Sequence, residues 1–386
     1  MNPNPEAYWP NMFFFILRQQ RTYGYDEMSE QPGFRDARYA QALKREIEYL
    51  SGNRQLRIVH VCGTHEDTIS QHGIRSLLPI GLSLVAGPGC PVCVCAAEDV
   101  DMAIAIAQQG HIVTTFGDMF RVPSTESSLA KERTKGADVR IVYGTNDAVE
   151  IAKKNPDREV VFVGVGFETT APTIALELLR SPPANFSILT SLKIIPPAMD
   201  LLVNIEGFSV DGFITPGHVS AIIGTNAFQP FAEKHHVPCV AAGFEPLDVL
   251  EAIRMILLQI NEGRAESENE YSRVVLPEGN IAAQRVLTQA FRINDAPWRG
   301  LGIIEKSGYF IKEEYVEHDA RLRFEFPNIE SVDILPGCRC HEVILGMVDP
   351  VDCKLFGNRC TPEEPYGPCM VGHEGTCKIR HENLIL

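Results

Sequence analysis

The feature that most constrains the fold is a regular alternation of short β-branched runs with helical patterns. The predicted strands lie at residues 57–61, 82–86, 112–116, 139–143, 160–165, 187–192, 212–215 and 239–242. Strands that alternate with helices are typical of doubly wound parallel sheets. We therefore predict an α/β fold with two similar Rossmann-like parallel-sheet domains, at residues 55–155 and 156–330.

Gly-rich polar motifs directly follow several of these predicted strands. They read Cys-Gly-Thr-His-Glu at residues 62–66, Gly-Pro-Gly-Cys-Pro-Val-Cys at 87–93, Gly-Phe-Glu-Thr-Thr at 166–170 and Pro-Gly-His-Val-Ser at 216–220. In open α/β sheets, ligands bind at the carboxyl ends of the strands. We expect two such edges to face each other across a cleft lined by Cys62, His65, Cys90, Cys93, Glu168 and His218.

Cys90 and Cys93 form a Cys-x-x-Cys pair in a turn between a predicted strand and a predicted helix at residues 96–109. The N–H groups and the dipole of a helix start favour the thiolate, which is the reactive form of cysteine. The pair can close a disulfide, exchange with another thiol or share a metal. We favour a redox or catalytic dithiol, because a reactive pair requires this strand–turn–helix context. The alternative is a zinc site, which needs two further ligands that Cys62 and His65 can supply.

The other candidate residues each have a structural alternative. Cys62 and His65 suit a nucleophile with its base or two ligands of one metal, yet a histidine in a turn is often a plain hydrogen-bonding residue. Glu168 and His218 are counted as candidate catalytic residues. Glu168 can instead stabilise a helix start through the helix dipole, and His218 can be an oriented core residue. The glycines lack a complete dinucleotide or P-loop pattern, so a nucleotide site has only weak support.

A different composition begins near residue 331, where a segment rich in Pro and Gly carries six cysteines: Cys338, Cys340, Cys353, Cys360, Cys369 and Cys377. Such a segment cannot build a large apolar core, so we expect a metal or disulfides to fold it. Structural zinc is usually held by two close Cys-x-x-Cys pairs, which this segment lacks. An iron–sulfur cluster accepts irregular spacing, and we predict one here. A zinc-stabilised interaction module remains an alternative.

Charge and composition narrow the classes of partner. The chain has 386 residues, a formal net charge of −15 and no visible Lys/Arg cluster, which argues against nucleic acid and anionic membrane surfaces. The apolar run at residues 12–17 is too short to span a bilayer, so we expect a cytoplasmic protein with an N-terminal extension at residues 1–33. In a reducing compartment, eleven cysteines favour metal binding or catalysis over a disulfide framework.

In their order along the chain, these motifs and the six-cysteine tail resemble the HypD family, the maturation factors of NiFe-hydrogenases. The likeness runs from about residue 34 to the C-terminus. It implies a scaffold that helps to assemble the Fe(CN)2CO group. In that family a small chaperone, HypC, binds HypD with the iron held between the two proteins. HypE delivers cyanide, and the finished group passes to the hydrogenase large subunit.

The resemblance also implies roles for individual residues. Cys62 would be the iron-ligating thiolate, with His65 as its neighbour in the site. Cys90 and Cys93 would be the redox dithiol. Thiolate ligands suit the low-valent iron that binds cyanide and carbon monoxide.

The resemblance further implies a 4Fe-4S cluster domain made of residues 34–54 and 331–386. The family's ligand pattern, C-x14-C-x6-C-x16-C, fits Cys338, Cys353, Cys360 and Cys377. This fit leaves Cys340 and Cys369 as a surplus pair.

One departure from the family pattern is visible. The family usually continues the Cys-x-x-Cys motif with Val-Thr-Pro, whereas this chain has Val94, Cys95 and Ala96. Cys95, otherwise expected to be an inert buried thiol, adds a third thiol within reach of the pair and favours mispairing or an altered potential. The main rival function is an iron–sulfur-dependent protein disulfide reductase, so whether the chain is an enzyme stays open.

Overall fold

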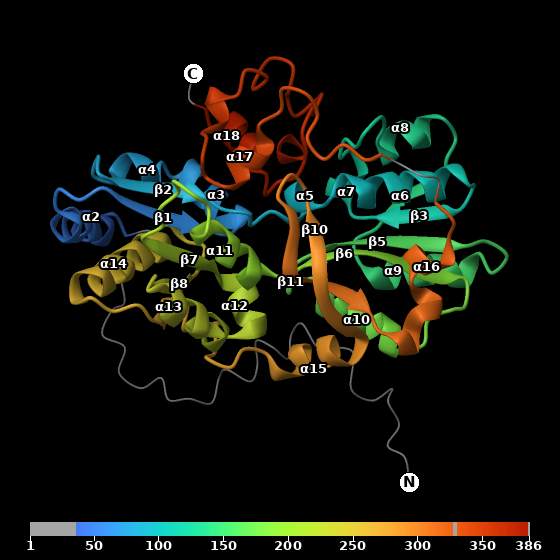
Figure 1. The fold of residues 1–386 in the computed structure, drawn as a ribbon, viewed down its shortest axis with the longest axis horizontal. Coiled ribbons are helices and arrows are strands. Elements are labelled where there is room, and N and C mark those ends of the chain that lie inside the picture. The colour runs from blue at the N-terminus through green and yellow to red at the C-terminus, as the bar shows by residue number, and fades with distance from the viewer. Residues whose placement is uncertain (1–35, 327–329, 385–386) are drawn as a thin grey trace, which may run out of the picture.

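The computed structural model describes residues 36–326 and 330–384, and the predicted N-terminal extension lies outside these ranges. Two β-sheets stand next to each other along the long axis of the molecule, and the C-terminal tail lies above both of them (Figure 1). In the part of the chain that the structure describes, no helix is long and apolar enough to cross a membrane.

A five-stranded parallel sheet forms one half of the molecule. In spatial order its strands are β2 (Leu82–Ala86), β1 (Leu56–His60), β7 (Gly212–Pro216), β8 (Cys239–Ala242) and β9 (Ser267–Asn269). His60, at the end of β1, pairs with Ala86 of β2 and Ile214 of β7. The motifs that follow these three strands therefore start at the same edge of the sheet.

A six-stranded sheet forms the other half. In spatial order its strands are β10 (Phe291–Trp298), β11 (Gly302–Ile311), β6 (Phe186–Lys193), β5 (Val160–Gly166), β3 (Ile112–Thr115) and β4 (Val139–Ile141). The strands from β6 to β4 are parallel, and β5 is buried along its whole length, as expected for a parallel strand covered on both faces. The hairpin β10–β11 adds to β6 in antiparallel orientation.

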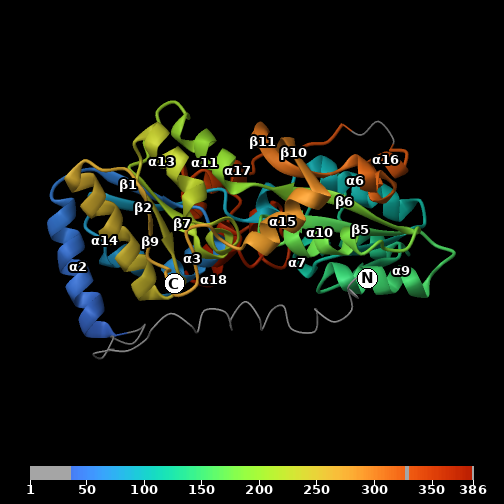
Figure 2. The ribbon, with the colours of Figure 1, turned by 90° about the horizontal axis from the view of Figure 1, so that it is seen from below.

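Helices follow most strands and cover the faces of both sheets (Figures 1 and 2). The longer ones are α2 (Ala37–Ser51), α3 (Gly63–Gln71), α6 (Ala97–Gln108), α9 (Thr145–Lys154), α10 (Ala171–Leu179), α11 (Ile195–Val203), α14 (Pro246–Glu262) and α15 (Ile281–Ala290). The shorter ones are α4 (Ile74–Leu77), α5 (Pro91–Val94), α7 (Gly117–Phe120), α8 (Leu129–Thr134), α12 (Gly217–Ile223), α13 (Gln229–His235), α16 (Ala320–Arg323), α17 (Cys340–Ile344) and α18 (Thr376–Glu382). Short 3-10 turns lie at Thr225–Phe228, Glu313–His318, Pro350–Asp352 and Pro368–Met370.

The predicted domain division assumed that each sheet is built from one continuous stretch of the chain. In the structure, both sheets take strands from two separate stretches. The chain forms β1 and β2, crosses to build β3 to β6, returns for β7 to β9, and crosses again for the hairpin β10–β11. The predicted boundary at residues 155 and 156 therefore falls inside the six-stranded sheet, between α9 and β5. A local alternation of strand and helix does not specify which sheet the next strand joins, and this explains the difference.

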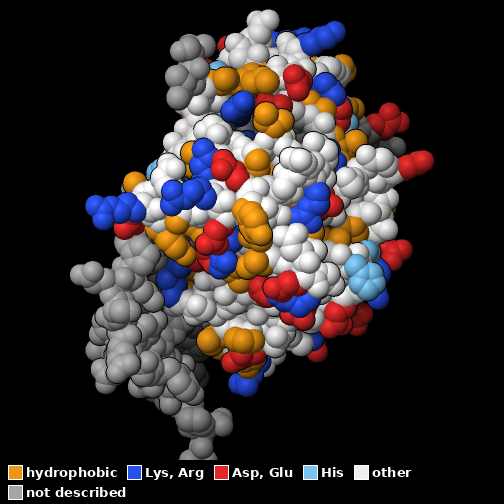
Figure 3. Space-filling model, turned by 90° about the vertical axis from the view of Figure 1, so that its left-hand side faces the viewer, with side chains coloured by type: hydrophobic (Ala, Val, Ile, Leu, Met, Phe, Trp, Pro, Cys, Tyr) orange, Lys and Arg blue, Asp and Glu red, His pale blue; other side chains and the backbone are white. Residues whose placement is uncertain are grey.

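Helix α2 packs against the five-stranded sheet and α14, and not against the cysteine-rich tail (Figure 2). Leu43 and Ile47 on its apolar face are buried in the same hydrophobic cluster as Ile253 of α14. Arg254 of α14 also forms an ion pair with Glu46 at 3.6 Å. The expected grouping of residues 34–54 with the tail is therefore corrected. At this end of the molecule, acidic and basic side chains are interspersed on the surface (Figure 3).

Candidate functional site

Cys62 caps the N-terminus of α3, just beyond the carboxyl end of β1. The backbone N–H groups of Thr64 and His65 lie near its sulfur and favour the thiolate. Burial raises the pKa of the Cys62 thiol to about 12, and the carboxylate of Glu374 adds to this effect. Cys62 is therefore a protonated thiol near neutral pH, and the two N–H groups are placed to stabilise its thiolate once the proton leaves.

His65, one turn into α3, is fully buried. Its Nε2 lies 2.8 Å from the carbonyl oxygen of Gly243 and 3.3 Å from that of Ala242. Because carbonyl oxygens only accept hydrogen bonds, Nε2 carries the ring proton and Nδ1 keeps a lone pair. Burial lowers the pKa of His65 to about 3, so the ring is neutral. Nδ1 has no hydrogen-bond partner among the described residues, which leaves it available to a ligand.

His218 lies in α12, just beyond the carboxyl end of β7. Its ring stacks on Phe244 with a centroid distance of 4.1 Å, and His65 contacts the same Phe244 ring at 4.9 Å. His218 keeps contact with solvent, and the partial burial of its ring lowers its pKa. The structure thus brings two sequence-predicted histidines to the same sheet edge through a shared aromatic neighbour.

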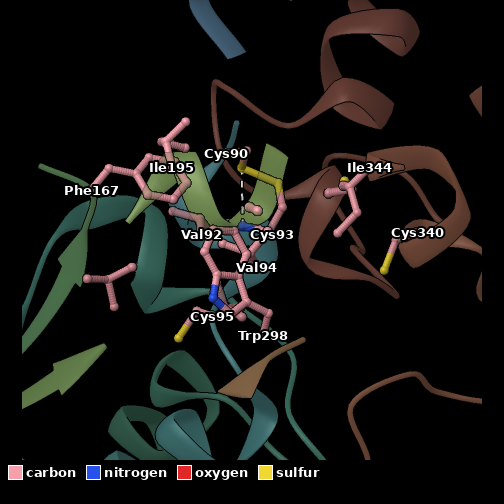
Figure 4. Close-up of a cluster of buried hydrophobic side chains, with 14 of the residues drawn as sticks. Cys90, Val92, Cys93, Val94, Cys95, Phe167, Ile195, Trp298, Cys340 and Ile344 are labelled. Atoms are coloured by element: carbon pink, nitrogen blue, oxygen red, sulfur yellow. Dashed lines mark hydrogen bonds between the residues drawn. A yellow bond between two sulfur atoms is a disulfide. The ribbon is translucent and has the colours of Figure 1, made fainter. Parts of the chain in front are cut away.

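Cys90 and Cys93 form a disulfide at the start of the short helix α5, as Figure 4 shows. Pro91 occupies the first helical position, and the backbone N–H of Cys93 donates to the Cys90 sulfur at 3.2 Å. The side chains of Cys90 and Cys93 are 4% and 0% exposed. The disulfide is therefore enclosed by the protein and is not presented on the surface.

The Cys62 motif and the Cys90–Cys93 motif touch each other directly. The backbone N–H of Gly63 donates to the carbonyl oxygen of Gly89 at 3.2 Å. A Cβ atom on Gly89 would lie 2.2 Å from the backbone nitrogen of Cys62, closer than any side chain can approach. The position of Gly89 therefore has to be glycine for the two thiol motifs to meet.

Glu168 follows β5 and is completely buried. Its Oε1 accepts a hydrogen bond from the backbone N–H of Ile195 at 2.9 Å, and its Oε2 has no partner among the described residues. Burial raises the pKa of Glu168 to about 7, so this carboxyl can hold a proton near neutral pH. Its neighbours Phe167 and Ile195 lie beside the disulfide in Figure 4, but no described interaction joins Glu168 itself to the thiols.

Cys95 points away from the disulfide, toward the opposite side of the segment (Figure 4). Its sulfur accepts a hydrogen bond from the hydroxyl of Ser191 on β6 at 3.3 Å. Burial, followed by the charge of Asp99, raises the pKa of the Cys95 thiol to about 11. The extra thiol is directed into the six-stranded sheet, so the expectation that it lies within reach of the Cys90–Cys93 pair does not hold in this structure.

All six tail cysteines line one cavity. The rest of its lining is largely apolar, with Val343, Leu355 and Phe356 among its members. The backbone N–H of Tyr366 donates to the sulfur of Cys360 at 3.4 Å. Soft thiol donors, an apolar wall and an N–H group aimed at sulfur are what an iron–sulfur cluster requires, so the residues fit this group.

The tail cysteines do not divide into four ligands and a separate disulfide in this structure. All six are free thiols, and hydrogen bonds join Cys338 to Cys340 and Cys377 to Cys369. The hydrogen bond from Cys340 lowers the pKa of the Cys338 thiol to about 7. Within the described ranges, no group of three or more Cys, His, Asp or Glu is already arranged as a metal site. The four predicted ligands, Cys338, Cys353, Cys360 and Cys377, therefore share a cavity without standing in ligand geometry.

Glu374 is a residue of this site that the sequence analysis missed. The hydroxyl of Thr64 donates to its Oε1 at 3.3 Å, and a Cβ on Gly63 would lie 2.2 Å from its Cβ. Burial raises the pKa of the Glu374 carboxyl. The sequence did offer one indication of its role. Glu374 stands three residues before Cys377, so a group bound by Cys377 would also hold Glu374 in place. Through Glu374 the tail rests on the Cys62 motif.

Fold and site together define a class of protein: a two-sheet α/β protein that brings a buried thiol, a disulfide and a cysteine-lined cavity to one place. The sequence model of the HypD family, described as "Hydrogenase formation hypA family", matches residues 38–383. The chain therefore belongs to the HypD family of hydrogenase maturation factors, and the resemblance seen in its motifs is confirmed.

Individual relatives agree with this assignment. The chain is 47% identical to a putative hydrogenase expression/formation protein of Methanocaldococcus jannaschii, over 84% of this chain and 91% of the relative. It is 43% identical to the hydrogenase maturation factor HypD2 of Bradyrhizobium diazoefficiens, over 89% of this chain and 94% of the relative. It is 41% identical to the hydrogenase maturation factor HypD of Escherichia coli, over 87% of this chain and 91% of the relative.

Proposed function

We propose that this protein is a redox-active scaffold that assembles the Fe(CN)2CO group of a NiFe-hydrogenase. In this proposal it acts with a HypC-type small chaperone, takes cyanide from a HypE-type donor and serves the hydrogenase large subunit indirectly. The observation that carries the proposal is the meeting of three thiol elements. Gly89 of the disulfide motif and Glu374 of the tail both contact the Cys62 motif at Gly63.

Cys62 and His65 are the residues proposed to hold the iron that is being assembled. Thiolate ligands suit low-valent iron, and the Nδ1 lone pair of His65 is free of other partners among the described residues. Because the pKa of Cys62 is about 12, iron binding has to release the thiol proton. The N–H groups of Thr64 and His65 then stabilise the thiolate that remains.

Cys90 and Cys93 are the proposed redox dithiol. Closing their disulfide releases two electrons and two protons, and opening it takes up the same numbers. Glu168 and His218 are the proposed acid–base groups of the site. Of the two, Glu168 has a pKa of about 7 and can exchange a proton at neutral pH.

The tail cavity is the proposed site of a 4Fe-4S cluster, held by Cys338, Cys353, Cys360 and Cys377. When bound there, the cluster would supply single electrons. The protein's own contribution is to exclude water with the apolar wall and to donate the Tyr366 N–H to the sulfur of Cys360.

The rival function, an iron–sulfur-dependent protein disulfide reductase, is less well supported. Such an enzyme must expose one sulfur of its disulfide to the thiolate of a partner protein. Here Cys93 is completely buried and Cys90 is almost so. This enclosure favours electron transfer inside the molecule over exchange with an external thiol.

The proposal is tested by replacing Cys62 with alanine and measuring iron retention and hydrogenase maturation. We expect Cys62→Ala to lose both, because no other thiol stands in the same position before α3. The matched control is Cys239→Ala, which removes a buried thiol of β8 that no proposed step uses. A Cys62→Ala protein that still matures hydrogenase would overturn the scaffold function. Dependence on Cys90 and Cys93 alone would favour the reductase.

A further inference from the structure

A buried arginine, Arg299, stands between the disulfide segment and the cysteine-rich tail. It lies in the turn that joins β10 to β11, and its side chain is only 1% exposed. The preceding Trp298 is fully buried and stacks on Phe167, which lies beside the disulfide. None of the functional motifs found in the sequence includes this turn.

Backbone contacts hold the turn firmly on both sides. The N–H of Arg299 donates to the carbonyl oxygen of Val94 at 2.9 Å, and Trp298 forms a β-bridge with Cys95. On the other side, the N–H of Gly300 donates to Asp333 at 3.0 Å. The backbone from which the Arg299 side chain extends is therefore held in place.

The side chain of Arg299 is directed toward the tail thiols. A second cavity is lined by Arg299 together with Cys338 and Cys340, and these two cysteines also line the first cavity. The Nη2 atom donates to the carbonyl oxygen of Pro123 at 3.0 Å, while the buried Nε has no partner among the described residues.

Arg299 also forms no ion pair with a carboxylate of residues 36–326 or 330–384. By contrast, the buried Arg321 is paired with Asp99. Enclosing a permanent positive charge without an anion is unfavourable. The acidic groups that share a cavity with Arg299 are Asp333, whose two oxygens accept backbone N–H groups, and the tail thiols.

We propose that Arg299 is a positioning residue whose charge stabilises the negative charge of a thiolate-bound iron–sulfur cluster in the tail cavity and so raises its reduction potential. Reduction adds one electron to the cluster, so a nearby cation stabilises the reduced form more than the oxidised form. This inference rests on the proposed function, because it requires a cluster in the cavity.

The test compares reduction potentials of the anaerobically purified full-length protein, titrated with dithionite and followed by electron paramagnetic resonance. Arg299→Met removes the charge, Arg299→Gln removes it but keeps hydrogen-bond donors, and Arg299→Lys keeps it. The control is Arg121→Gln, since Arg121 binds the tail carbonyls of Pro362 and Glu363 from an exposed position. We expect more negative potentials for the Met and Gln variants, a nearly unchanged potential for the Lys variant and no shift in the control.

The outcomes separate this inference from the function on which it rests. A wild-type protein without any cluster signal refutes the proposed function. A cluster with the wild-type potential in Arg299→Met or Arg299→Gln refutes the role of Arg299 alone. Loss of the cluster in Met and Gln but not in Lys supports the role of the charge. Loss in all three variants shows that only the shape of arginine matters and overturns the proposal.

Discussion

At the scale of single residues, burial determines the chemistry of Cys62. Its thiol is neutral because the surroundings are desolvated and because Glu374 adds a nearby negative charge. The tail carboxylate therefore adds to the effect of burial and makes the thiol harder to deprotonate. The position of the tail thus influences the pKa of Cys62, and with it the ability of this thiol to bind a metal.

Replacing Glu374 with glutamine should make Cys62 more reactive. The change removes a charge that raises the pKa of Cys62, so a larger share of thiolate forms at mildly alkaline pH. We expect alkylation of Cys62 by iodoacetamide at pH 8 to be several-fold faster, measured by mass spectrometry of the Cys62 peptide. Glu363→Gln, an exposed tail substitution, is the control and should leave the rate unchanged. An equal or slower rate in Glu374→Gln would contradict the account.

Buried Glu66 of α3 binds His60 of β1, and its replacement by glutamine should destabilise the protein. Burial alone would raise the pKa of Glu66, but the charge of Arg75 and the hydrogen bond with His60 hold it at about 2. We expect Glu66→Gln to lower the free energy of unfolding by about 3 kcal/mol, near the low end for breaking a buried ion pair because Arg75 keeps some contact with water. Urea unfolding at pH 7 measures this, with the exposed Glu150→Gln as control.

The pH dependence of this contribution has a definite sign. A carboxyl whose pKa is lower in the folded than in the unfolded protein stabilises the fold above its unfolded pKa. The contribution of Glu66 is therefore complete at neutral pH and is lost as the pH falls from its ordinary value of 4.5 toward 2. The difference in stability between wild type and Glu66→Gln should shrink over this range, and a constant difference would contradict the assignment.

At the scale of elements, the close approach of two turns fixes the site. A Cβ on Gly89 would collide with the Cys62 backbone, whereas one on Gly117 would make an ordinary contact at 3.8 Å. We expect Gly89→Ala to cost about 1–3 kcal/mol of stability and to reduce iron retention, because the Cys62 turn has to move. Thermal unfolding and iron analysis measure both effects, with Gly117→Ala as control. Unchanged iron retention in Gly89→Ala would show that the contact is not needed.

The limits of most strands could be predicted from the sequence, whereas the segments that each strand contacts could not. The strands at residues 82–86 and 239–242 were predicted to the residue, because each is a short apolar run ended by a turn signal. The hairpin β10–β11 was missed, since its strands carry exposed polar residues such as Asn294 and Asp295 and lack a clear alternation. Glu374 and Arg299 were missed because their roles come from contacts between segments far apart in sequence.

At the scale of the whole molecule, the tail lies across the junction of the two interleaved sheets (Figure 1). Buried tail residues such as Cys369 and Cys377 belong to the same hydrophobic cluster as Cys93 and Val163. The walls of the tail cavity therefore pack against the disulfide segment. A group bound in the cavity would keep a constant position relative to the disulfide.

Serine substitutions in the tail should separate cluster ligands from their neighbours. We expect loss of the cluster when Cys338, Cys353, Cys360 or Cys377 is replaced, because serine oxygen is a poor substitute for a thiolate on iron. Replacing Cys340 or Cys369 should leave a cluster bound, and these two variants serve as matched controls in the same cavity. Iron and sulfide analysis after anaerobic reconstitution measures the result. Loss of the cluster in the Cys340 or Cys369 variant would revise the ligand set.

In the proposed function, Cys62 carries the iron on which the cyanide and carbon monoxide ligands are assembled. Infrared spectroscopy of the protein, purified anaerobically with its HypC-type small chaperone, tests this most directly. We predict cyanide and carbonyl stretching bands in the wild-type complex and their absence in Cys62→Ala, with Cys239→Ala as the control that keeps them. Bands that persist in Cys62→Ala, or no bands in wild-type preparations that retain their cluster, would contradict the account.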